Sequence, residues 1–186
     1  MHSKKIVITG APGTGKTVVI NDLKARGFHC YPEIIRDMTA EAKQTDTQRE
    51  QVSNPLVFVD DPLDFNAKLL YGRKAHYDDS LTYAGPVCFF DRGVPDVLAY
   101  MDYFKQAYPP EFMEVAQQSS YNTIFILPPW EAIYQSDNER LETFAEAEAL
   151  HDHLKATYTN LGYRPLLVPK ASIKERSDYI LETLGL

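Results

Sequence analysis

The most constraining feature of this chain is a glycine-rich motif near its beginning. Residues 5–9 (KIVIT) form a short run rich in β-branched side chains, and residues 10–17 follow with the sequence GAPGTGKT. The motif fits G-x-x-x-x-G-K-[ST] at every fixed position. Because strand, loop and helix patterns arrive in the required order, we interpret it as a phosphate-binding loop. The alternative is a glycine-rich turn with an exposed lysine.

The residue types of this loop suit a triphosphate. Its glycines let backbone N–H groups approach phosphate oxygens closely, and the helix that follows adds free N–H groups and the positive end of its dipole. We expect Lys16 to neutralise the β- and γ-phosphates and the Thr17 hydroxyl to bind Mg²⁺. The predicted nucleotide contacts are Gly10, Ala11, Pro12, Gly13, Thr14, Gly15, Lys16, Thr17 and Val18.

Length and composition limit the remaining possibilities. A chain of 186 residues suits a single domain over residues 1–186, and a net charge of −7 argues against a general nucleic-acid-binding surface. No apolar run is long enough to span a membrane, and the first residues lack a signal-peptide pattern. Cys30 and Cys88 are far apart in apolar segments, which favours buried thiols over a disulfide or redox pair. We therefore expect a cytoplasmic protein.

The hydrophobic pattern alternates between strands and helices. We predict strands at 5–9, 28–31, 86–91, 122–127 and 164–168, and helices at 17–26, 34–42, 62–83, 95–104, 111–118, 143–161 and 172–184. Such alternation is typical of an α/β protein in which helices cover both faces of a parallel sheet. Ligands of these sheets bind beyond the carboxyl ends of the strands.

Three charged residues follow predicted strands and should share that edge of the sheet. Glu33 comes after the second strand, and Asp91 and Arg92 end the third. An aspartate at this place in phosphate-loop proteins holds Mg²⁺, usually through water, and the neighbouring arginine would lie over the phosphates. The alternative is a surface Asp-Arg pair at a strand end.

Two other groups of polar residues fit structural roles better than metal binding. The carboxylates of residues 60–64 (DDPLD) match a helix start, with Asp61 as N-cap and Pro62 at the first helical position. His151 and His153 are two residues apart in a predicted helix, so they do not share a face. The segment from 130 to about 143 is polar and follows the fourth strand, where a flap over the nucleotide would lie.

The motifs together resemble the nucleoside- and nucleotide-kinase branch of the phosphate-loop superfamily. More closely, DRGVPDVLAY (91–100) and LPPWEAIYQSDNERLETFAEA (127–147) resemble the small, single-domain "AAA-type" predicted ATPases related to the kinase domain of ribosylnicotinamide kinase. The resemblance covers nearly the whole chain. It implies a P-loop NTPase fold of three α/β/α layers, with a five-stranded parallel sheet in the order 2-3-1-4-5.

The resemblance also implies roles for individual residues. In kinases of this branch a carboxylate after the second strand accepts the proton of the substrate hydroxyl, which points to Glu33. Lys16, Mg²⁺, Arg92 and a flap arginine would then stabilise the transferred phosphoryl group. Arg140 is the flap candidate, although it could instead be a solvated helix-start arginine paired with Glu139 or Glu142.

Some family features are missing. The segment 130–143 contains one arginine, whereas nucleoside kinases often carry more. The chain is too short for the extra helical domain of an unfolding motor and shows no matching arginine finger and sensor pair. It also lacks the guanine-specific N-K-x-D, which favours ATP over GTP.

Two functional hypotheses remain. The first is a Mg²⁺- and ATP-dependent phosphotransferase acting on a small, hydroxyl-bearing, nucleoside-like metabolite. The second is an ATP or GTP switch that signals to a partner, with the polar segments 43–54 and 131–142 as switch elements. The acceptor pocket would be lined by whichever of Tyr31, Arg36, Phe65, Tyr71 and Tyr100 face inward, among which the sequence does not choose.

Overall fold

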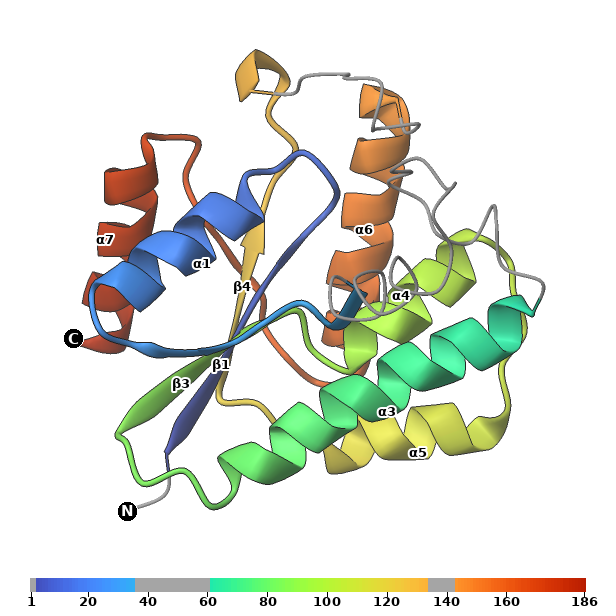
Figure 1. The fold of residues 1–186 in the computed structure, drawn as a ribbon. Coiled ribbons are helices and arrows are strands. Elements are labelled where there is room, and N and C mark those ends of the chain that lie inside the picture. Colours follow the sequence, from blue (N-terminus) through green and yellow to red (C-terminus); the bar gives the residue numbers. More distant parts are fainter. Residues whose placement is uncertain (1–2, 36–60, 134–142) are drawn as a thin grey trace, which may run out of the picture.

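The computed structural model describes residues 3–35, 61–133 and 143–186. Its strands are β1 (Lys4–Gly10), β2 (His29–Tyr31), β3 (Val87–Asp91), β4 (Thr123–Leu127) and β5 (Leu166–Leu167). Its helices are α1 (Lys16–Ala25), α3 (Pro62–Ser80), α4 (Pro95–Tyr103), α5 (Pro110–Gln118), α6 (Phe144–Asn160) and α7 (Ile173–Leu184), with a short 3₁₀ helix at Glu131–Ile133 (Figure 1).

The five strands form one sheet in the order β2-β3-β1-β4-β5, and all four strand pairs are parallel. The predicted fold class and strand order are therefore confirmed. β1 is the central strand, with Val7 opposite Phe90 of β3 and Ile124 of β4. Because all strands run in one direction, their carboxyl ends meet at a single edge of the sheet.

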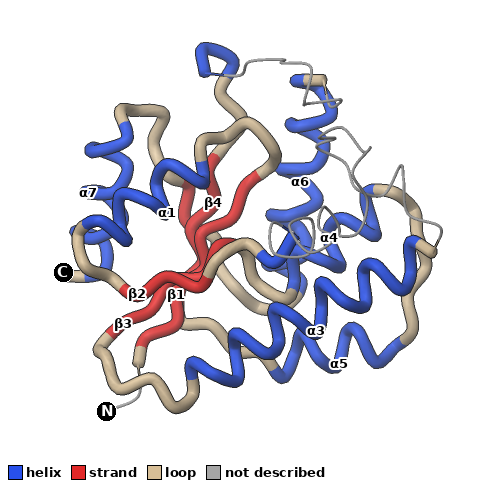
Figure 2. The backbone as a smooth tube through the Cα atoms, in the orientation of Figure 1, coloured by secondary structure: helices blue, strands red, loops and turns tan. Residues whose placement is uncertain are grey.

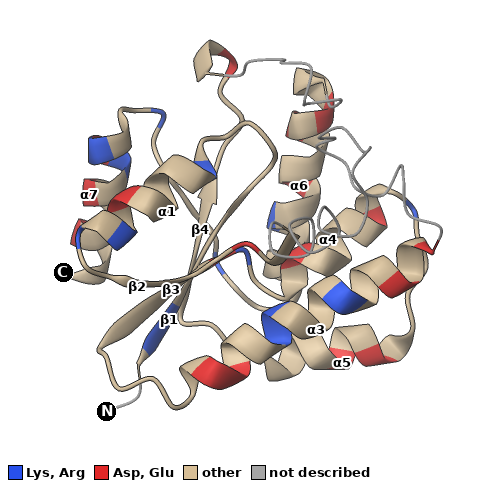
Figure 3. Ribbon diagram, viewed as in Figure 1, with Lys and Arg blue, Asp and Glu red and all other residues tan. Residues whose placement is uncertain are grey.

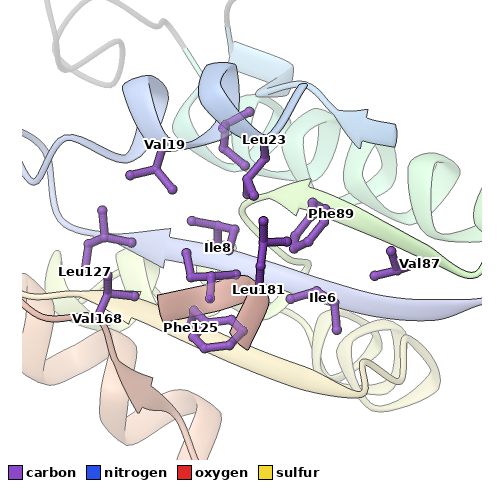
Figure 4. Close-up of a cluster of buried hydrophobic side chains, with 12 residues drawn as sticks. Ile6, Ile8, Val19, Leu23, Val87, Phe89, Phe125, Leu127, Val168 and Leu181 are labelled. Carbon is purple, nitrogen blue, oxygen red and sulfur yellow. The ribbon is translucent and has the colours of Figure 1, made fainter. Parts of the chain in front are cut away.

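Helices cover both faces of this sheet (Figures 1 and 2). α1 and α7 lie on one face, and α3, α4, α5 and α6 lie on the other. Alternate residues of β1 enter different cores: Ile6 and Ile8 pack with residues of α1 and α7, whereas Val7 packs with Tyr158 of α6. Figure 4 shows the first of these cores between α1, α7 and the strands. Burial on both faces explains why the strands read as continuous apolar runs.

Side-chain caps mark the starts of α3, α6 and α7, and the sequence predicted the one at Asp61. The Asp61 carboxylate accepts hydrogen bonds from the backbone N–H groups of Leu63 and Asp64, both at 3.0 Å, so it caps α3. α6 and α7 each begin with a capping box, Thr143 with Glu146 and Ser172 with Glu175. These contacts fix where each helix begins relative to the edge of the sheet.

The structure differs from the sequence predictions in some bounds. α3 ends at Ser80 rather than near residue 83, since residues 81 and 82 form a turn. The fifth strand covers two residues rather than 164–168 because, at the edge, it pairs with β4 alone. Most of the predicted helix 34–42 lies outside the described residues.

Two further expectations can be compared with the structure. Cys30 and Cys88 are both free thiols, as predicted, and burial raises the pKa of each. Among the helices in the described ranges, none has the length and apolarity of a membrane span.

Candidate functional site

The phosphate loop connects β1 to α1 at the carboxyl edge of the sheet (Figure 1). Gly13 and Gly15 both have left-handed backbone conformations, with φ of 78° and 79°. Gly15 is also the N-cap of α1, and no side chain caps the helix there. The N-terminus of α1 therefore has no side-chain cap at its N-cap position, which is compatible with a helix whose start binds phosphate.

Residues from separate elements meet next to this loop. Lys16 Nζ lies 2.8 Å from Asp91 Oδ1 at the end of β3 and 4.0 Å from Glu33 Oε2 after β2. Arg92 Nε lies 2.6 Å from the same Glu33 oxygen. The structure thus brings together four residues predicted from the sequence: Lys16, Glu33, Asp91 and Arg92.

Glu33 is buried and surrounded by cations. Its Oε1 accepts a hydrogen bond from Arg73 Nη2 at 2.8 Å, while Oε2 pairs with Arg92. Burial acts to raise the pKa of Glu33, but the charges of Arg73, Arg92 and Lys16 outweigh it and lower the pKa to about 2. In this arrangement Glu33 is a stable anion and a weak proton acceptor.

Arg73 is a member of the site that the sequence analysis did not identify. It lies in α3, is 4% exposed, and donates from Nη1 to the carbonyl of Gly93 at 3.5 Å. A signal was present, because Arg73 falls on the buried stripe of α3 defined by Leu69, Leu70 and Tyr77. A charged residue on an apolar helical face indicates a buried charge that needs a partner.

Asp96 is a second unpredicted member, since the sequence placed it only at a helix start. It is fully buried, and its carboxylate accepts hydrogen bonds from the Thr9 hydroxyl, the Gly93 N–H at 3.0 Å and the Tyr158 hydroxyl at 2.5 Å. Arg92 Nη1 completes the set at 3.2 Å. Asp96 therefore connects β1, the turn after β3 and α6.

Arg92 is held in an uncommon backbone conformation, with a φ of 73°. Its N–H donates to the carbonyl of Ile8 at 3.1 Å, and its guanidinium lies 5.1 Å from the centre of the Tyr100 ring. A left-handed non-glycine residue is disfavoured unless its surroundings fix it. Here the carboxylates of Glu33 and Asp96 and the ring of Tyr100 hold Arg92 in this conformation. We call Lys16, Glu33, Arg73, Asp91, Arg92 and Asp96 the carboxylate network.

The predicted magnesium residues offer suitable oxygen atoms. Asp91 Oδ1 is buried and forms an ion pair with Lys16 but no hydrogen bond. Thr17 lies in the first turn of α1, directly after Lys16. A carboxylate and a hydroxyl are donors that Mg²⁺ accepts. Within the described ranges no three His, Cys, Asp or Glu residues are grouped as a metal site.

Other predicted positions are placed differently or not placed. Arg36, Arg140, the segment 43–54 and residues 134–142 of the segment 131–142 lie outside the described residues. Among the described acceptor-pocket candidates, Tyr31 donates to Asp79, Tyr71 donates to Glu111, and Phe65 packs against the core between α3, α4 and α5. Tyr100 lies against the Arg92 guanidinium and so contacts the carboxylate network.

Sequence comparison identifies the family. A family model described as an AAA domain matches residues 5–176, which is most of the chain. The chain belongs to this family. No curated protein matches the sequence of this AAA-domain chain.

Solved structures similar to this AAA-domain chain include NadR, a deoxyadenosine kinase and a thymidylate kinase. NadR in complex with NR is 16% identical with a TM-score of 0.68; the match covers 99% of this chain and 51% of NadR, so the chain spans about half of NadR's length. Deoxyadenosine kinase from M. mycoides with bound dATP is 14% identical (TM-score 0.61, covering 98% and 100%). Thymidylate kinase from Ehrlichia chaffeensis is 14% identical (TM-score 0.64, covering 100% of both chains). At these identities the likeness shows the shared fold.

Proposed function

We propose that this protein is a Mg²⁺- and ATP-dependent phosphotransferase whose acceptor is a small, hydroxyl-bearing, nucleoside-like metabolite. The observation that carries the proposal is the carboxylate network beside the phosphate loop. In this network Lys16 pairs with Asp91, and Arg73 and Arg92 both pair with Glu33. The fold supports it, since NadR was solved with NR and with NAD and AMP-PNP, and deoxyadenosine kinase with dATP.

The donor nucleotide would bind along the loop from Gly10 to Thr17. Lys16 would exchange its ion pair with Asp91 for the β- and γ-phosphates, which frees the Asp91 carboxylate. Thr17 and Asp91 would then hold Mg²⁺, Asp91 usually through water. When bound, Mg²⁺ neutralises charge on the phosphates. A cytoplasmic location fits this use of ATP.

The acceptor hydroxyl would lie near Glu33. Three cations hold the pKa of Glu33 at about 2, which makes it a weak base. Nucleotide binding would draw Lys16 and Arg92 towards the phosphates, and the loss of these partners would raise the proton affinity of Glu33. Arg73 would remain to orient the carboxylate. Glu33 would thus become a base only when the donor is bound, and Arg140 would supply further charge from the flap.

The variant Glu33→Gln tests this proposal. Transfer from radiolabelled Mg-ATP to a panel containing ribosylnicotinamide and deoxyadenosine should fall about 10²- to 10⁴-fold, while ATP affinity is retained. Exposed Glu148 of α6 provides the matched control, and Glu148→Gln should behave as wild type.

Two results would count against the phosphotransferase. One is wild-type protein that binds ATP tightly and phosphorylates no member of the panel. The other is a Glu33→Gln variant with unchanged nucleotide turnover, which is the behaviour expected of a nucleotide switch.

A further inference from the structure

Arg176 differs from the arginines of the carboxylate network. It lies in the first turns of α7, is 5% exposed, and its Nη1 donates to the carbonyl of Thr14 in the phosphate loop at 3.1 Å. Its Nε is buried without a hydrogen-bond partner, as is the Nε of Arg73, so the difference lies in the ion pairs. No ion pair joins Arg176 to a carboxylate of the described residues, whereas Arg73 and Arg92 both pair with Glu33.

A buried guanidinium without a counter-charge is costly for the folded protein. Moving a charge out of water is unfavourable unless an opposite charge or a full set of hydrogen bonds compensates it. Consistent with this, burial lowers the pKa of Arg176, and no nearby charge opposes that shift. The position of this charge is therefore difficult to explain by stability alone, and an anion beside the loop would compensate it.

The contact with Thr14 acts on a peptide group of the phosphate loop. The Thr14 carbonyl and the Gly15 N–H belong to the same planar peptide, and no peptide bond in the described residues is cis. The two groups of a trans peptide point in opposite directions. Because Arg176 holds the carbonyl on its own side, the Gly15 N–H faces the other side, where the loop would hold phosphate. A hydrogen bond to the carbonyl also polarises the peptide and strengthens the N–H as a donor.

The close approach of Arg176 also favours glycine at position 15, because a larger residue would not fit. A Cβ added at Gly15 would lie 2.7 Å from Arg176 Nη1, in addition to the strain from a φ of 79°. Arg176 and Thr14 also line a small recess with Trp130 and Lys170. The two charged residues of that recess, Lys170 and Arg176, are both positive, so its charge favours an anion.

We propose that Arg176 is a positioning residue for the phosphates of the donor nucleotide. It orients and polarises the Thr14–Gly15 peptide, and its unneutralised charge adds to the positive field of the loop. The inference rests on the nucleotide-binding part of the proposed function. The motif sequence suggests that residues 10–17 alone bind the phosphates. The inference gives a residue of α7, outside the motif, a part in that binding.

The test compares Arg176→Met with wild-type protein by calorimetric titration with Mg-ATP and with Mg-tripolyphosphate, which has no base or sugar. Affinity for both should fall about tenfold, the usual size of a lost charged hydrogen bond. The ligand-free unfolding midpoint should stay the same or rise, since the variant removes an uncompensated charge. Arg176→Lys, which keeps the charge, should recover part of the affinity.

Arg26→Met is the matched control, because Arg26 pairs with Asp178 and so also joins α1 to α7, away from the loop. It should leave both affinities unchanged. The inference is overturned if Arg176→Met binds tripolyphosphate as tightly as wild type, if only ATP affinity falls, or if the ligand-free variant is destabilised or fails to fold. Absence of phosphoryl transfer in wild type would instead defeat the proposed function and leave these binding results standing.

Discussion

Buried positive charge is compensated differently on the two sides of the phosphate loop. On the β3 side, Arg73 and Arg92 share Glu33, and Arg92 also pairs with Asp96. On the α7 side, Arg176 is equally buried but donates to a backbone carbonyl. By contrast, basic and acidic positions are interspersed along α1, α3 and α7 (Figure 3). Paired charges hold the elements of the site together, whereas an unpaired charge contributes fully only when an anion binds.

The largest effect is expected from Lys16→Ala, because Lys16 pairs with Asp91 and would instead contact the phosphates when a nucleotide binds. The variant should lose measurable Mg-ATP binding, and turnover should fall by about 10³-fold or more. Equilibrium binding and a turnover assay measure this. Exposed Lys24 on the same helix is the control, and Lys24→Ala should be unaffected. Wild-type binding by Lys16→Ala would refute the site assignment.

A smaller effect, on stability, is expected from Asp96→Asn. The substitution would leave Arg92 with one carboxylate and disturb hydrogen bonds from Thr9, Gly93 and Tyr158. Breaking a buried ion pair costs about 3–5 kcal/mol, so the free energy of unfolding should fall by about that amount in denaturant titrations.

Asp102→Asn is the control for this prediction, since Asp102 is exposed on the same helix. It should change the free energy of unfolding by less than about 0.5 kcal/mol. Equal stability of the Asp96 and Asp102 variants would show that the pairing of Asp96 with Arg92 does not stabilise the β3 side of the loop.

The sequence was sufficient for the parts of this comparison that depend on local patterns. The motif at residues 10–17, the apolar strands and the cap at Asp61 are short-range signals, and the structure has the expected elements there. Glu33, Asp91 and Arg92 could be grouped because parallel strands end at one edge. The resemblance to kinases added the strand order.

The missed residues depend on contacts between distant parts of the chain. Arg73 meets Glu33 across 40 residues, Asp96 meets Thr9 across 87, and Arg176 meets Thr14 across 162. Each is a charged residue within a helix, and its distance along the chain from its partner hides the contact. The apolar stripe of α3 indicates that Arg73 is buried, but only the packing of α3, α4 and α7 on the sheet shows the partners, and only the partners show whether the charge is compensated.

The smallest effect is expected from the pH dependence of the paired side. Lys16, Arg73 and Arg92 face Glu33 and lower its pKa from 4.5 to about 2, although burial alone would raise it. A depressed pKa contributes stability that is fully present above about pH 4.5 and is lost as the pH falls towards about 2. Glu33→Gln lacks this contribution at every pH.

Unfolding midpoints of both proteins, measured from about pH 7 to about pH 3, should therefore differ by a constant amount near neutrality and converge below about pH 4.5. The other carboxylates titrate in both proteins, so the comparison isolates Glu33. A difference that persists unchanged to about pH 3 would mean that Glu33 does not gain its stability from the three cations.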